Sequence, residues 1–224
     1  MADGEAVIEL AALPTLCSRW LIPKLPSFLA QHASVSLNCT SRFLPFDFAT
    51  EPFDAALHFG APAWPGGVLY RLFDERMVAV CAERFRDAHD LDDEDGLQTA
   101  PLLQQSTRPE AWANYFDEGS RARPAAARGA RFDQISMLIE AAIAGMGAAL
   151  LPEFLIENEL ADGSLVRIGK RTLATQNAYY FVAAEDKAGL AHIVQFRQWL
   201  LAQAGRFRAY DEVVPTPPEP SLGA

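Results

Sequence analysis

Side chains able to do acid–base, nucleophilic or metal chemistry occur in this sequence, but they form no known catalytic pattern. The nucleophile-elbow motif G-x-S-x-G, the zinc motif H-E-x-x-H and the P-loop are all absent. His32 and His89 lie in polar stretches, His192 lies on a predicted helix surface, and no two histidines have metal-ligand spacing. His58, inside the apolar run AALHF, is interpreted as a half-buried core residue rather than a catalytic one. The residues therefore favour a protein that is not an enzyme and that uses no metal or cofactor.

Two further segments approach a binding motif without completing it. Residues 145–150 (GMGAAL) are similar to a dinucleotide-binding G-x-G-x-x-G, but the third glycine is missing and the segment leads from a helix to a strand. The acidic residues 89–96 match part of an EF-hand loop. In that register the first and last ligand positions would be Leu91 and Leu102, so a solvated loop is the better interpretation.

The charge balance argues against a nucleic-acid surface on this chain. The 224 residues carry a formal net charge of −10 and the pI is about 4.8. Because affinity for DNA depends on Lys and Arg neutralising phosphates, such a surface repels the DNA backbone. Half of the residues are hydrophobic and 21% are charged, as in an ordinary globular protein with a sizeable core.

Cysteine usage and the N-terminus predict a soluble cytosolic protein. The three cysteines, Cys17, Cys39 and Cys81, form no C-x-x-C pair, and an odd number argues against a disulfide framework. The opening residues MADGEAVIEL contain no secretory signal. No apolar run reaches the roughly 20 residues that a membrane span needs, so we expect no membrane partner.

The elements that must position any site alternate between strand and helix, which predicts a largely parallel sheet with crossovers. The β-prone runs are residues 6–12, 35–40, 55–59, 68–73, 77–82, 102–105, 147–151, 165–168 and 178–184. The expected helices are residues 18–31, with Pro23 either in a first turn or at a kink, 109–118, 133–145, 153–160 and 188–202. Asp133 is the expected N-cap of the clearest helix, and Gly145 is expected to end it. Residues 119–129 read as a basic connection, and we expect the Pro-rich tail 208–224 to be disordered.

Four segments together carry a more specific pattern. Residues 13–32 contain the core W-L-I-P-K-L, and residues 48–66 contain D-A-A-L-H-F-G followed by a Trp-Pro-Gly loop. Residues 72–85 (LFDERMVAVCAERF) read as a crossing strand, and residues 131–155 contain a helix followed by G-M-G-A-A-L-L-P. In this order and spacing they resemble the effector-binding domain of LysR-type transcriptional regulators, particularly the branch of the glycine-cleavage and β-lactamase activators. The apolar residues 43–46 (FLPF) depart from that pattern, at a loop where they affect the pocket or a contact.

The resemblance implies an α/β fold of the two-lobed, type 2 periplasmic-binding-protein kind, with two crossover strands. Lobe I would comprise residues 6–79 plus 184–207, and lobe II residues 80–183, with residues 77–82 and 178–184 as the crossings. It further implies a small-molecule effector in the cleft between the lobes, where helix N-termini present free N–H groups.

Placed on this sequence, the resemblance assigns ligand-binding residues to the turns after several strands. Thr15 and Ser18 follow the first strand, and Thr15 is the best single candidate. The full set is Thr15, Ser18, Thr40, Ser41, Phe59, Gly60, Trp64, Ser106, Thr107, Phe132, Asp133 and Pro152. Ser106, Thr107 and Asp133 serve equally well as plain helix caps, and Trp112, another candidate aromatic wall, is interpreted as a core residue.

The same resemblance implies the partners. Converging helix N-termini favour an anionic or zwitterionic metabolite such as an amino acid, and relatives pair side by side, so we expect a homodimer or tetramer. The family also carries a winged helix-turn-helix that this chain lacks, so DNA would be bound only through that missing N-terminal domain. We expect either a piece of a longer regulator or a stand-alone sensor. The alternative from another class is a solute-binding protein of a transport system on the same fold.

Overall fold

The protein is described by a computed structural model that covers residues 6–117 and 129–205. The chain divides into two compact units: unit 1 is Met1–Glu75 with Thr175–Ala224, and unit 2 is Arg76–Ala174. The expected lobe boundaries, at residues 79–80 and 183–184, fall in the same two strands as the division. The expected connection at residues 119–128 and the tail at residues 208–224 lie outside the described residues.

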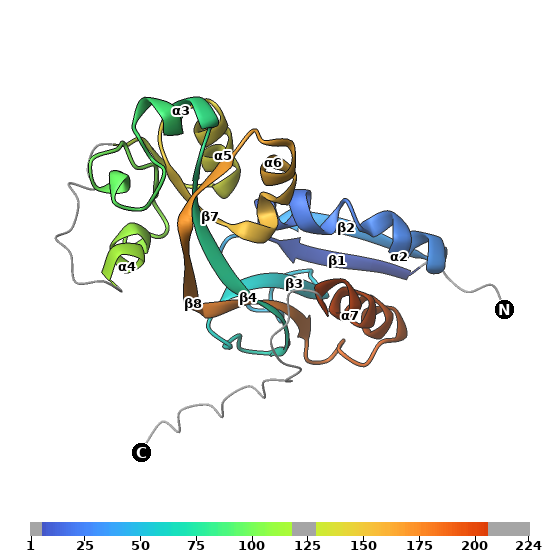
Figure 1. The fold of residues 1–224 in the computed structure, drawn as a ribbon. Helices are drawn as coiled ribbons and strands as arrows, with labels where there is room; N and C mark the ends of the chain where they lie inside the picture. The colour runs from blue at the N-terminus through green and yellow to red at the C-terminus, as the bar shows by residue number, and fades with distance from the viewer. Residues whose placement is uncertain (1–5, 118–128, 206–224) are drawn as a thin grey trace, which may run out of the picture. The chain divides into compact units, whose positions relative to one another are not determined.

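The two units are built from short strands and helices in alternation (Figure 1). The strands are β1 (Ala6–Ala12), β2 (Val35–Ser41), β3 (Ala55–Gly60), β4 (Gly67–Cys81), β5 (Gln104–Gln105), β6 (Arg131–Phe132), β7 (Ala149–Pro152) and β8 (Val166–Ala184). The α-helices are α1 (Pro14–Leu16), α2 (Leu25–Gln31), α3 (Glu83–Ala88), α4 (Ala111–Asp117), α5 (Ile135–Ile143), α6 (Glu157–Asp162) and α7 (Ala191–Ala204). A π-helical turn, η1 (Cys17–Leu21), follows α1 directly, and two 3-10 turns are η2 (Gly96–Gln98) and η3 (Glu153–Leu155).

Unit 1 is organised around three parallel strands. In Figure 1, β1 and β2 lie side by side; β1 pairs in parallel with β2 along its whole length and with β3 over its last three residues. The return strand β8 then pairs antiparallel with β3. The expectation of a largely parallel sheet therefore holds for β1 to β3. In unit 2, β5 also pairs in parallel with β6, whereas β8 with β3 and β4 with β7 are antiparallel pairs. The core of this unit includes Phe28, Phe181 and Phe196, whose rings meet edge to face.

Two pairs of expected strands are joined in the structure. The runs at residues 68–73 and 77–82 form the single strand β4, and those at residues 165–168 and 178–184 form β8. The prediction of separate strands was wrong here, because the strands continue through the polar residues that lie between the runs. Glu75, which lies between the first pair of runs, is fully buried and accepts hydrogen bonds from the hydroxyls of Tyr179 (3.0 Å) and Thr175 (3.3 Å). A polar residue with such partners can continue a buried strand.

The helix expected at residues 18–31 is interrupted. Helical backbone runs from Pro14 to Leu21, and α2 starts at Leu25 with Pro26 in its first turn. Pro23 lies in the break, where its missing N–H costs nothing. The prolines thus divide the segment instead of merely bending it.

Unit 2 packs α5 against β4 and β7. Its buried face includes Leu138, Ile139 and Ala142, and Gly145 ends the helix with a φ of 75°, as the sequence predicts. The N-cap is Gln134, so the prediction that Asp133 caps this helix was wrong. None of the helices in the described part of the chain is long and apolar enough to cross a membrane.

Candidate functional site

The carboxyl ends of β1, β2 and β3 bring six of the expected ligand-binding residues to one edge of unit 1. Ala12 at the end of β1 stands opposite Ser41 of β2 and Leu57 of β3, and parallel strands end on the same side of their sheet. We call this region the carboxyl edge. It carries Thr15, Ser18, Thr40, Ser41, Phe59 and Gly60.

Thr15 and Ser18 sit where β1 passes into helical backbone. Pro14 starts α1, since its fixed φ suits a first helical position. Thr15 is buried, whereas Ser18 is exposed and its hydroxyl donates weakly to the Thr15 carbonyl at 3.4 Å. At this turn Ser18 therefore exposes a hydroxyl, and the buried Thr15 lies beside it at the start of α1.

The end of β2 adds polar and cationic groups. Thr40 and Ser41 are exposed, and the Arg42 backbone N–H donates to the Ala12 carbonyl at 3.0 Å, which ties the end of β2 to β1. The Arg42 guanidinium pairs with Glu51 at 3.0 Å. An arginine at this edge favours a ligand with a carboxylate or phosphate, because its planar fork matches such groups.

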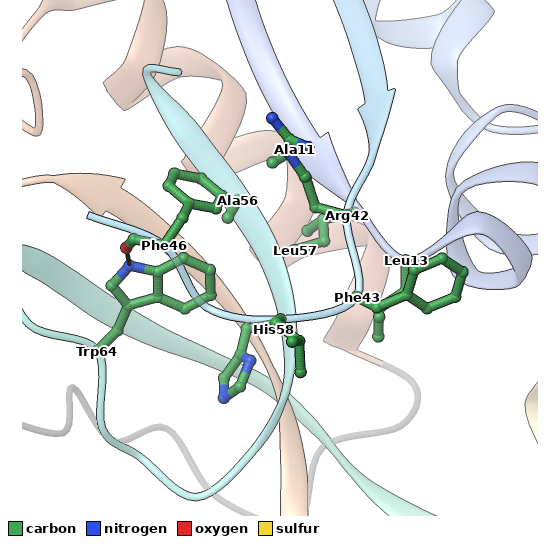
Figure 2. Close-up of a pocket in the computed structure, with 10 residues that line it drawn as sticks. Ala11, Leu13, Arg42, Phe43, Phe46, Ala56, Leu57, His58 and Trp64 are labelled. Carbon is green, nitrogen blue, oxygen red and sulfur yellow. Dashed lines mark hydrogen bonds between the residues drawn. The ribbon is translucent and has the colours of Figure 1, made fainter. Parts of the chain in front are cut away.

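Trp64, another of the expected ligand-binding residues, packs among aromatic side chains. It is buried, and its Nε1 donates to the Phe46 carbonyl at 3.0 Å. Figure 2 shows Trp64, Phe46 and His58 together, with Phe43 projecting away from them. The ring centroids of Phe46 and His58 lie 5.1 and 5.2 Å from that of Trp64, both edge to face.

These aromatic residues border a small hollow. Its volume is about 10 Å³, and it is lined by Ala11, Leu13, Arg42, Phe43, Leu44, Phe46, Ala56, Leu57, His58 and Trp64. That volume accommodates roughly one water molecule, so the hollow by itself does not hold a metabolite. Burial lowers the pKa of His58, although a hydrogen bond with the Ala61 backbone partly opposes the shift.

In unit 2, a second group of expected residues meets at the ends of the parallel strands β5 and β6. The Ser106 N–H and hydroxyl both donate to the Phe132 carbonyl, at 2.8 and 3.3 Å. The Thr107 hydroxyl accepts from Gln105 Nε2 at 3.0 Å. Asp133 is exposed and follows β6 directly. The hydroxyls of Ser106 and Thr107 therefore hold the turn as well as being available at its surface.

Two other expected residues belong to the interior of unit 2. Pro152 is buried at the end of β7 opposite Met77. Trp112 is buried in a hydrophobic cluster with Tyr115 and Phe116, and its Nε1 donates to the Leu103 carbonyl at 2.8 Å. The interpretation of Trp112 as a core residue is confirmed.

Several residues near the carboxyl edge of unit 1 were not predicted from the sequence to lie at a binding site. They are Arg42, Phe43, Phe46 and His58. The signal that was available is the apolar run 43–46, noted only as a departure from the family pattern. Across the described ranges, no group of three or more His, Cys, Asp or Glu side chains is arranged to hold a metal ion.

Comparison with known proteins agrees with this architecture. Residues 3–205 match the family described as the LysR substrate binding domain. The chain is 27% identical over 203 residues to the glycine cleavage system transcriptional activator of Escherichia coli K12, covering 90% of this chain and 66% of that protein. It is 30% identical over 208 residues to the HTH-type transcriptional activator AmpR of Citrobacter koseri, covering 90% and 69%. The chain thus spans about two thirds of the length of these relatives, which are transcriptional regulators and not enzymes.

The solved structures give the fold. The effector domain of AmpR from Pseudomonas aeruginosa superposes with a TM-score of 0.79 at 28% identity, covering 90% of this chain and 96% of that one. The expected α/β fold of the type 2 periplasmic-binding-protein kind is confirmed, and a transport protein is not favoured. The chain therefore belongs to the LysR substrate binding domain family, the effector-sensing part of LysR-type transcriptional regulators.

Proposed function

We propose that this chain senses a small anionic or zwitterionic metabolite through the carboxyl edge of unit 1. The observation that carries the proposal is the family match over residues 3–205. The polar groups at the edge support the ligand class: the hydroxyls of Thr15 and Ser18 stand at a helix start, and the exposed guanidinium of Arg42, which is paired with Glu51, lies at the end of β2. In unit 2, Ser106, Thr107, Phe132 and Asp133 form a second candidate group with the same donor chemistry.

The proposed output is a shift between conformations. A ligand moves such an equilibrium only by its differential affinity for the two states. In the complete regulator, a separate DNA-binding domain would convert the shift into altered transcription. We expect gel retardation of a labelled duplex by the complete regulator and none by this chain, whose net charge is −10. Retardation by the chain alone would contradict this division of labour.

A thermal-shift screen of amino acids and small carboxylates on the purified chain tests the sensing proposal. A true ligand should raise the melting temperature in a concentration-dependent manner, since ligands that bind only the folded state stabilise it. Calorimetry would then compare Thr15→Val and Ser106→Ala with Thr99→Val and Ser164→Ala, hydroxyl-deleting controls at residues that belong to neither group and whose hydroxyls donate to the carbonyls of Gly96 and Glu159.

We expect Thr15→Val to weaken binding roughly tenfold, the cost of one buried hydrogen bond to a charged group, while both control variants bind like the parent. A screen without any stabilising metabolite contradicts the sensing role. Unchanged affinity in both Thr15→Val and Ser106→Ala shows that the ligand binds elsewhere.

A further inference from the structure

Two of the cysteines, which lie far apart in the sequence, have their sulfur atoms close together in unit 1. The Sγ atoms of Cys17 and Cys39 are 2.9 Å apart, although 22 residues separate them. A disulfide needs a separation of about 2.05 Å. The two sulfurs therefore lie within about 1 Å of bonding distance, a gap that small side-chain rotations can close.

The backbone around the pair is firmly held. Cys39 lies on β2 directly opposite Leu10 of β1. The Cys17 N–H donates to the Leu13 carbonyl at 2.9 Å, just beyond the end of β1. Cys39 is thus held by pairing with β1 and Cys17 by the residue that directly follows β1, so hydrogen-bonded backbone positions both cysteines.

The environments of the three thiols differ. Cys39 is exposed, whereas Cys81 is completely buried in a hydrophobic cluster and its pKa is raised to about 11, mainly by burial. The hydrogen bond from the Cys39 thiol lowers the pKa of Cys17, and the same bond raises the pKa of Cys39. Cys17 is buried beside the exposed Cys39. Because the thiolate is the reactive form, the shared hydrogen bond supports Cys17 as the nucleophile of the pair and Cys39 as the partner that resolves its oxidised form, and the variants described below test these roles.

We propose that Cys17 and Cys39 form a redox-sensitive pair that a hydroperoxide converts into an intramolecular disulfide. In the first step the Cys17 thiolate attacks the terminal peroxide oxygen, the O–O bond breaks, and an alcohol or water leaves after taking up a proton. Cys17 is then a sulfenic acid. In the second step the Cys39 sulfur attacks the Cys17 sulfur, the S–O bond breaks, and water leaves with the Cys39 proton. The two sulfurs supply the two electrons that reduce the peroxide.

The disulfide would tie the helical segment that follows β1 to the strand β2. Thr15 lies two residues before Cys17, and Thr40 follows Cys39 directly. Oxidation would therefore restrict the part of the carboxyl edge that we propose for effector binding. This consequence rests on the proposed function, whereas the thiol chemistry does not.

The test treats the complete reduced chain with cumene hydroperoxide, alkylates the remaining thiols and determines the mass. We expect two of the three thiols to be lost, a mass decrease of two hydrogens, and a peptide map that links Cys17 to Cys39. The oxidised chain should melt about 5 °C higher, because the cross-link restricts the unfolded chain, and dithiothreitol should reverse the shift.

Variants assign the two roles. Cys81→Ser, the matched control, should oxidise like the parent. Cys39→Ser should stop at a Cys17 sulfenic acid that dimedone traps, and Cys17→Ser should keep its thiols. An unchanged thiol count in the parent chain, a disulfide between two chains, or preferential oxidation of Cys81 would overturn the proposal; the parent measurement decides even if a variant fails to fold.

Discussion

Buried polar side chains are few among the described residues: Thr15, Glu75 and Gln104. Burying a polar group costs free energy unless it is hydrogen-bonded. Glu75 accepts two hydroxyl hydrogen bonds, and Gln104 Nε2 donates to the Leu102 carbonyl at 3.2 Å, so both have a structural explanation. Thr15 differs in its position, because it stands at the carboxyl edge where we propose that the effector binds.

His58 gives a prediction about pH. Its imidazole packs against Trp64 and Tyr180, and burial lowers its pKa below the ordinary value of 6.5. The unfolded chain therefore binds the proton more readily than the folded chain. The stability that depends on neutral His58 is present above about pH 6.5 and is lost as the pH falls towards the folded pKa.

We expect His58→Gln to remove this dependence. The melting temperatures of the parent and the variant would be compared from about pH 8 to about pH 5. The difference in melting temperature between the parent and the variant should shrink below pH 6.5, while His89→Gln, at an exposed position, serves as the control. A constant difference between the parent and His58→Gln over the whole range would show that His58 does not titrate differently on folding.

The long strand β8 is held in place by a side chain from the acidic loop that precedes η2. Gly169 has a φ of 62°, a left-handed conformation, inside this long strand. The Glu94 carboxylate accepts the backbone N–H groups of Lys170 and Arg171, both at 2.8 Å. Burial opposes ionisation of Glu94, but these N–H groups hold its pKa below the usual value. The acidic loop, interpreted from the sequence as merely solvated, thus stabilises the start of β8.

Gly169→Ala should destabilise unit 2. A Cβ atom there would lie 2.2 Å from Glu94 Cδ, in addition to the strain of a positive φ, and we expect a loss of about 1–3 kcal/mol. Gly163→Ala is the matched control, because Gly163 also has a positive φ, 79°, but has open space around it. Thermal unfolding followed by circular dichroism measures both. Equal losses in the two variants would mean that the contact with Glu94 contributes nothing.

At the scale of the whole molecule, each unit has its own core, and β4 and β8 pass from one unit into the other. Glu75 is the last residue of unit 1 before the division, and Thr175, its hydrogen-bond partner, is the first residue after the return. The buried Glu75 carboxylate therefore holds β4 and β8 together at the point where both strands leave unit 1.

Self-association is the prediction at this scale. Ile22, in the break before α2, is 52% exposed, and Leu29 on α2 is also exposed. Large apolar side chains so placed are suited to an interface, and the resemblance to LysR-type regulators implies that chains pair side by side. We propose that the chain forms a homodimer or tetramer through this segment.

Light scattering at tens of micromolar would measure the assembly. Ile22→Glu should raise the dissociation constant of the assembly by at least about tenfold, since a charge would be buried at the interface without a partner. Leu190→Glu, at a similarly exposed apolar residue of unit 1 outside this segment, should leave the assembly unchanged. A parent chain that is entirely monomeric, or a Leu190→Glu variant that dissociates as readily as Ile22→Glu, would argue against this surface.

Much of the fold was readable from local sequence. The run at residues 6–12 is β1 without change, and Gly145 ends α5 as expected. An alternation of apolar residues favours a strand, and a glycine favours the end of a helix, through the conformation of the neighbouring backbone. The sequence alone is therefore sufficient to predict these features. The family was likewise predictable from the sequence, because four segments occur in the order and spacing that LysR-type regulators show. The placement of Thr15 after β1, and of Thr40 and Phe59 near the ends of β2 and β3, also followed from sequence, because strand ends are local features.

Interactions between distant residues decided the rest. The strands β4 and β8 continue through polar stretches because distant residues form hydrogen bonds there. Glu75 accepts a hydrogen bond from Tyr179, 104 residues away, and Glu94 accepts one from the Lys170 backbone, 76 residues away. Trp64 was expected at a ligand wall, yet its indole donates to Phe46, 18 residues away. The approach of Cys17 to Cys39 likewise needs the pairing of β1 with β2. The sequence by itself determined which residues are available and where elements begin, whereas tertiary structure decided which distant side chains meet, because such contacts arise only when the sheet forms.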